Sequence, residues 1–168
     1  MSGIAIGVLA RAPLPGRCKT RLLAVHGAEW VSGLYAAMLR DTLDGLQALS
    51  ADAYLVFVAP PEGEGGGPGV LAGKDQMELA LSVLARHVHA PWELVPHEGE
   101  DERSARVRHA FRSMFARGAE YALLAGSDAP SFPTEPLEEA LADEATKSQV
   151  LIGPSEDGGY YVDCVAQG

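Results

Sequence analysis

The chain has little cysteine, few basic residues and no long apolar run. Its 168 residues include two cysteines, Cys18 and Cys164, which by themselves form neither a disulfide framework nor a zinc site. The net charge of −10 excludes a general affinity for nucleic acid or for an anionic membrane surface. The apolar stretch at residues 3–10 is too short to cross a bilayer, and it lacks the preceding positive charges of a signal peptide. We therefore expect a cytoplasmic protein with a single domain over residues 1–168, and the sequence says nothing about its oligomeric state.

Two common nucleotide-binding fingerprints are also missing. The chain has neither the GxxxxGK[ST] spacing of P-loop ATPases nor the GxGxxG of dinucleotide dehydrogenases. It has instead a basic loop after the first apolar run, at residues 9–22 with the sequence LARAPLPGRCKTRL. No acidic residue precedes Glu29, whereas residues 29–168 contain 9 basic and 23 acidic residues. A loop with this local excess of positive charge predicts a small anionic ligand.

The basic loop has the residue types that a phosphate site needs. Gly16 lets the backbone approach a ligand, and Pro13 restricts the freedom of the loop. Arginine offers a planar fork of donors to phosphate oxygens, and lysine offers a point charge. The alternative is that these cations belong to a solvated turn and the start of a helix. The four candidate phosphate-binding cations are Arg11, Arg17, Lys19 and Arg21.

Hydrophobic periodicity predicts strands that alternate with helices. Short apolar runs predict strands at residues 3–10, 53–59, 92–96, 121–125, 150–153 and 160–165. Helical spacing predicts helices at residues 31–49, 75–88 and 102–116 and a further helix from residue 134, with Asp75 and Thr134 as caps. The Gly- and Pro-rich residues 60–69 predict a surface loop. This alternation predicts a layered α/β domain with a largely parallel sheet, whose ligands gather beyond the carboxyl ends of the strands.

Two acidic loops follow predicted strands and supply candidate metal ligands. Asp128 lies in GSDAPSFP after the strand at 121–125, and Asp157 lies in PSEDGGYY after the strand at 150–153. Magnesium usually takes one or two protein carboxylates and completes its shell with water and substrate phosphates, so these two would suffice. The alternatives are an Asx-type turn at Asp128 and an ordinary β-turn at Asp157.

Three motifs along the chain resemble a bacterial family grouped with the nucleotide-diphospho-sugar transferases, of the GT-A glycosyltransferase type. They are RAPLPGRCKTRL, then SDAP after a strand, then EDGGYY, and the resemblance covers nearly the whole chain. More distantly, the chain is similar to the phospholactate and molybdenum-cofactor guanylyltransferases. The resemblance implies a three-layer α/β/α Rossmann-like fold with a mainly parallel mixed sheet, a nucleotide or nucleotide-sugar substrate, and a divalent metal, Mg²⁺ or Mn²⁺.

Carried over residue by residue, the resemblance identifies most of the candidate site. Lys19 and Asp128 are the candidate catalytic residues, and Asp128 and Asp157 are the candidate metal ligands. The candidate nucleotide and phosphate ligands are Arg11, Pro13, Gly16, Arg17, Lys19, Arg21, Ser127, Gly158 and Gly159.

The chain departs from the family pattern at three places. Arg11 stands where the family usually has lysine, and residues 102–104 do not match an Asp-Leu-Gly-x-Arg pattern that Arg106 does match. The chain also ends at Gly168, sooner than such domains usually do, which indicates either a truncated chain or an incomplete active site.

The sequence therefore predicts a magnesium-dependent transferase with a largely electrostatic mechanism. Two chemistries fit the same residues, namely nucleotidyl transfer with release of pyrophosphate, and glycosyl transfer with release of a nucleoside diphosphate. A nucleotide-binding module without catalysis is the alternative from a different functional class.

Overall fold

A computed structural model describes residues 3–60, 73–97, 102–131, 133–143, 150–155 and 160–167. Its elements, in chain order, are β1 (Ile4–Arg11), the 3-10 helix η1 (Thr20–Ala24), α1 (Ala28–Gln47), β2 (Ala53–Ala59), α2 (Gly73–Leu84), β3 (Trp92–Pro96), α3 (Arg103–Ala116), β4 (Tyr121–Gly126), α4 (Thr134–Ala142), β5 (Leu151–Pro154) and β6 (Tyr160–Ala166). All six predicted strands and four predicted helices are present.

The strands form one six-stranded sheet in the order β3-β2-β1-β4-β6-β5. Parallel pairing joins β3, β2, β1 and β4, while β6 pairs antiparallel with both β4 and β5. The predicted mainly parallel mixed sheet is thus confirmed. Because β2 lies on one side of β1 and β4 on the other, the order reverses at β1. In open α/β sheets such a reversal opens a crevice at the carboxyl ends of the two central strands.

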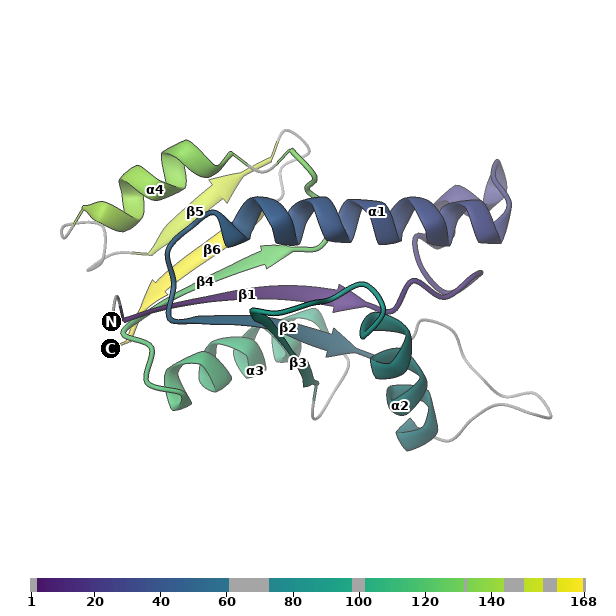
Figure 1. Ribbon diagram of the computed structural model, residues 1–168, viewed down its shortest axis with the longest axis horizontal. Coiled ribbons are helices and arrows are strands. Elements are labelled where there is room, and N and C mark those ends of the chain that lie inside the picture. Colours follow the sequence, from purple (N-terminus) through teal and green to yellow (C-terminus); the bar gives the residue numbers. More distant parts are fainter. Residues whose placement is uncertain are drawn as a thin grey trace.

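Helices cover both faces of the sheet, so the predicted three layers are confirmed. One apolar core contains residues of α1, α2 and α4, and the other contains residues of α3. In Figure 1, α1 and α4 lie above the strands and α3 lies below them. A Cβ atom on Gly7 of β1 would lie 2.9 Å from Phe57 and 3.1 Å from Met114, so glycine allows α3 to pack closely on the central strand.

Two local predictions are wrong in detail. Helix α2 begins at Gly73, so Asp75 lies in its first turn and does not cap it. Pro133 occupies the cap position of α4 without a side-chain hydrogen bond, and Thr134 is already helical. The predicted loop at 60–69 lies outside the described residues apart from Pro60.

Within the described residues, no helix is both long and apolar enough to span a membrane.

Candidate functional site

A tight turn after β1 starts the site. Arg17 N donates to Leu14 O at 3.0 Å, and Gly16 between them has φ +75°. Proline at the second position and a left-handed glycine at the third are typical of a type II turn. Cys18 follows, buried, with its Sγ 3.4 Å from Leu14 O. The turn therefore reverses the chain and fixes the start of the next segment.

Lys19 has the only left-handed backbone among the non-glycine residues that the structure describes, with φ 46° and ψ 44°. This conformation costs an L-residue about 1–2 kcal/mol. Residues in such conformations are often found at functional sites, where the surrounding structure holds them. The short helix η1 begins directly after Lys19 and includes Arg21.

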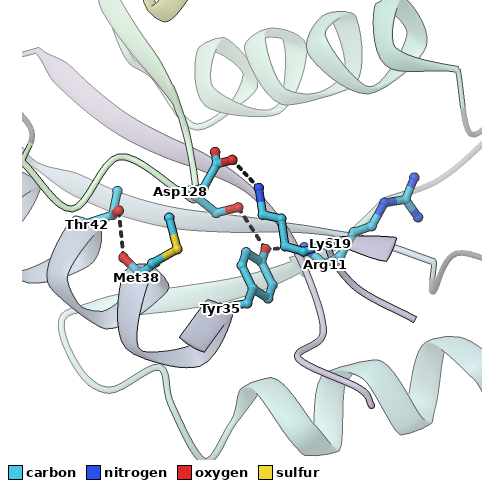
Figure 2. Close-up of polar contacts among 7 residues, drawn as sticks. Arg11, Lys19, Tyr35, Met38, Thr42 and Asp128 are labelled. Carbon is cyan, nitrogen blue, oxygen red and sulfur yellow. Dashed lines mark hydrogen bonds and ion pairs between the residues drawn. The ribbon is translucent and has the colours of Figure 1, made fainter. Parts of the chain in front are cut away.

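Strand β4 ends beside this segment, and Ser127 and Asp128 follow directly after it. Lys19 Nζ forms an ion pair with Asp128 Oδ2, across 109 positions of sequence (Figure 2). The side chains of Lys19 and Asp128 are 32% and 47% exposed, so solvent and ligands can reach both. The structure thus joins the two residues that the sequence proposed as catalytic.

Tyr35 of α1 lies beneath this ion pair. Its hydroxyl accepts a hydrogen bond from Arg11 N at 3.1 Å and lies 2.8 Å from Ser127 Oγ. Lys19 Nζ lies 5.5 Å from the centre of the Tyr35 ring, within the range of a cation–π contact. Burial raises the pKa of Tyr35, so its hydroxyl stays protonated at neutral pH.

A cavity of about 460 Å³ lies at the carboxyl end of β1. Four cationic side chains line it: Arg11, Lys19, Arg21 and Arg106. Its wall also includes Cys18, Tyr35 and Ser127. The Arg11 guanidinium donates to Pro60 O, which ties the end of β1 to the segment after β2. This cationic cavity suits an anionic ligand.

A second cavity, of about 580 Å³, lies on the other side of the ion pair. Asp128, Tyr160, Tyr161 and Asp163 line it, together with Leu9 and Leu124. Leu9 also lines the cationic cavity, so the two cavities are adjacent. Lys19 lines the first cavity and Asp128 the second, and their ion pair therefore lies at the boundary between the two.

Arg103 adds a positive charge to the carboxylates and aromatic rings that line the second cavity. Its guanidinium carbon lies 5.1 Å from the centre of the Tyr160 ring. Burial raises the pKa of Asp163, and the positive charge of Arg103 partly opposes this. The cavity thus combines aromatic, cationic and carboxylate groups.

The structure brings together only some of the predicted phosphate ligands. Arg11, Lys19, Arg21 and Ser127 line the cationic cavity, and Asp128 lies at its boundary. The residues absent from the linings of both cavities are Pro13, Gly16 and Arg17. Pro13 is buried and Gly16 forms the turn. Asp157, Gly158 and Gly159 lie outside the described residues.

The described part of the chain contains no group of three or more His, Cys, Asp or Glu side chains that could hold a metal ion. A closed protein metal centre is therefore not formed by these residues. Asp128, with its partly exposed carboxylate at the edge of a cationic cavity, fits a Mg²⁺ ion that takes its remaining ligands from water and substrate phosphates.

Sequence reasoning missed several residues of the site, among them Tyr35, Arg103 and Arg106. Tyr35 fits the apolar stripe of α1, so its spacing indicates only a core position. Arg103 and Arg106 belong to a basic stretch that is more typical of a solvated helix face, yet they line the second and the first cavity. The match of Arg106 to the family pattern was the one available signal.

His97 and His109 also lie together, with their Nδ1 atoms 3.3 Å apart, but neither lines the two cavities.

Comparison with known proteins supports the predicted fold group. No curated protein matches this chain. A crystal structure of a "putative nucleotide-diphospho-sugar transferase" from Desulfovibrio desulfuricans G20 matches with a TM-score of 0.75 and 28% sequence identity. The match covers 99% of this chain and 64% of that protein, so this chain spans less than two thirds of the solved structure. The chain thus has the same α/β fold as this solved structure.

The family comparison concerns the part of the chain from α2 onward. Residues 73–167 match the sequence profile of a family described as "Uncharacterized protein conserved in bacteria (DUF2064)". This region includes Arg106, Ser127 and Asp128, whereas the basic loop precedes it. The chain belongs to this conserved bacterial family, DUF2064.

Proposed function

We propose that the protein is a transferase that binds the phosphates of a nucleotide or nucleotide sugar in its cationic cavity. The observation that carries this proposal is the contact between Lys19 and Asp128 at the boundary of two adjacent cavities. Phosphate chemistry requires two groups close together: a cationic side chain that binds the phosphate and a carboxylate that holds a metal ion.

The charge and size of the cationic cavity support a phosphorylated ligand. The protein has a net charge of −10, yet four basic side chains surround this one space. Its volume of about 460 Å³ lies within the usual range for small-molecule sites. The arginines can form paired hydrogen bonds with phosphate oxygens, and Lys19 supplies a point charge.

The same residues fit a divalent cation, Mg²⁺ or Mn²⁺. Asp128 would hold it together with phosphate oxygens of the substrate, as hard cations require. Such an ion would supply positive charge that stabilises the phosphate leaving group. Lys19 pairs with Asp128 in the structure, and on binding it exchanges the carboxylate for a phosphate oxygen. Arg11 and Arg21 orient the phosphate chain, and Arg106 adds positive charge from α3.

Two transfer reactions are compatible with this arrangement. In nucleotidyl transfer, an acceptor oxygen bonds to the α-phosphorus of a nucleoside triphosphate, and pyrophosphate leaves. In glycosyl transfer, the acceptor bonds to the anomeric carbon of a nucleotide sugar, and the nucleoside diphosphate leaves. The second cavity, with Arg103, Tyr160 and Asp163, is the space available for the second reacting group. The name of the D. desulfuricans neighbour favours glycosyl transfer.

Calorimetric titration tests the binding step. The probes are the nucleoside triphosphates and their diphosphate sugars, each titrated with and without MgCl₂. The proposal expects binding that strengthens with Mg²⁺, and product analysis then distinguishes pyrophosphate from nucleoside diphosphate. Metal-independent binding without turnover would instead indicate a non-catalytic nucleotide-binding module. The absence of binding for every probe would reject both functions.

A further inference from the structure

The side chain of Tyr35 contacts each of the three segments that supply the ion pair and its surroundings. Its hydroxyl contacts the backbone of Arg11 at the end of β1 and the side chain of Ser127 after β4. Its ring lies under the ammonium group of Lys19. Figure 2 shows Tyr35 pointing from α1 toward Arg11 and Lys19, with Asp128 beyond them.

Two other buried or partly buried hydroxyls form hydrogen bonds with residues close to them in the sequence. Thr42, on the same helix, donates to Met38 O of its own helix at 2.8 Å (Figure 2). Tyr54 donates to Leu49 O at 2.5 Å and accepts from Ala51 N at 3.2 Å, both within five positions. The Tyr35 hydroxyl instead joins residues 24 and 92 positions away. Its bonds therefore connect elements rather than stabilise a local turn.

The geometry of these contacts constrains the two charged groups. Ser127 directly precedes Asp128, so the bond to Tyr35 fixes the start of the segment that holds the carboxylate. The Tyr35 ring limits where the Lys19 ammonium can lie, since a cation is attracted to the ring face. Lys19 also has a strained left-handed backbone that the surroundings must hold. One buried side chain thus acts on both partners of the ion pair.

We propose that Tyr35 is a positioning residue that holds Lys19 and Asp128 at the separation needed to bind phosphate and metal together. It acts on the two ligands through Lys19 and through Ser127. This inference rests on the proposed function for its ligand, but the positioning itself is measurable without one.

Tyr35→Phe is the test variant, because it keeps the ring and removes the two hydroxyl contacts. Tyr54→Phe is the matched control, since it also removes a hydroxyl with two hydrogen bonds, near the start of β2. With Mg²⁺ present, we expect Tyr35→Phe to weaken affinity for the nucleotide that binds wild type best by about tenfold, which is about 1.4 kcal/mol. Tyr54→Phe should change it by less than about twofold. Equal affinities in the two variants would overturn the proposal.

A double-mutant cycle separates positioning from a general structural effect. If Tyr35 acts through Lys19, the loss caused by Tyr35→Phe should largely disappear when Lys19→Met is already present. Losses that simply multiply would contradict the proposal. Ser127→Ala removes the partner hydroxyl and should reproduce most of the Tyr35→Phe effect even if Tyr35→Phe folds poorly.

Amide NMR spectra without nucleotide provide the second measurement. Tyr35→Phe should speed hydrogen exchange at Arg11 and shift the amide signals of Lys19 and Asp128, whereas Tyr54→Phe should leave these signals in place. Unchanged Lys19 and Asp128 signals would overturn the positioning role. If wild type binds no nucleotide, the proposed function fails, and these spectra still decide the role of Tyr35.

Discussion

The two ends of the sheet use polar side chains in different ways. At the amino end, Gly3 N donates to Asp52 Oδ2 at 2.7 Å, and the Tyr54 hydroxyl contacts backbone atoms of the preceding turn. At the carboxyl end, side chains from separate elements contact one another, as in the Lys19–Asp128 ion pair and the Tyr35–Ser127 bond. Both ends also have a cavity, of about 340 Å³ at the amino end and about 460 Å³ at the cationic site.

This difference separates groups that stabilise the fold from groups that can bind a ligand. A side chain that forms hydrogen bonds with nearby backbone atoms satisfies polar groups that folding would otherwise leave unpaired. A partly exposed ion pair between side chains contributes only about 0–1 kcal/mol to stability, so its partners can be exchanged at little cost. We therefore expect substitutions at the carboxyl end to affect binding and turnover, and those at the amino end to affect stability.

Asp128→Asn should have the largest effect on function. It removes the carboxylate that fits a metal ion, so turnover should fall on the order of a hundredfold or more. The melting temperature should hardly change, because the side chain is 47% exposed. Asp52→Asn at the amino end is the control and should leave turnover intact. Unchanged turnover in Asp128→Asn, or an equal loss in both variants, would remove the distinction between the two ends.

Lys19→Met should have the next largest effect. Hydrogen bonds to charged groups are worth about 1.5–3 kcal/mol, so nucleotide affinity measured by calorimetry should fall about tenfold to a hundredfold. Lys74→Met removes the same charge from an exposed position on α2 and should have no measurable effect on binding. If both variants lose affinity equally, the binding depends on net charge and not on the Lys19 site.

A comparison of two arginines in the basic loop tests which part of the loop binds the phosphates. Arg21 lines the cationic cavity and Arg17 does not. Arg21→Ala should therefore weaken nucleotide affinity about fivefold, while Arg17→Ala should change it by less than about twofold. Each variant removes one positive charge, and the two positions lie four residues apart. Calorimetry of both variants at the same ionic strength therefore compares them directly. A larger loss for Arg17→Ala would place the phosphates elsewhere on the loop.

Alkaline pH should have the smallest effect on the site. It should lower the stability of the fold and leave ligand binding by the folded protein unchanged. Burial raises the pKa of Cys164 to about 12, so the folded protein keeps the proton that the unfolded chain loses near its ordinary value of about 8.5. The stabilising contribution is complete below the unfolded value and is lost as the pH rises toward the folded one, with a slope approaching about 1.4 kcal/mol per pH unit.

Urea unfolding of wild type and Cys164→Ala between pH 8 and pH 10 measures this contribution. The pH dependence should be weaker in the variant, while nucleotide affinity of the folded protein at pH 8 should be the same in both. A variant that keeps the full pH dependence would assign the alkaline loss to other groups.

Sequence patterns were most informative where each residue's role depends on its immediate neighbours. The strand at 53–59 and the strand at 92–96 are found at the predicted residues. Helix starts were harder, because Gly73 and Pro133 lie before the residues whose side chains indicated a cap. Tyr35 was unpredictable as a site residue, because helical spacing shows that it points inward but not which hydroxyl it meets there.

The sequence by itself determined the alternation of strands and helices, the local excess of positive charge before Glu29, and the identity of Lys19 and Asp128 as candidates. Only the tertiary structure decided that these two residues form a pair, that Arg106 joins the cationic cavity, and that Arg17 stays outside it. The physical reason is that periodicity and composition act over a few residues. Contacts across 92 or 109 positions depend instead on the strand order, which places the carboxyl ends of β1 and β4 side by side.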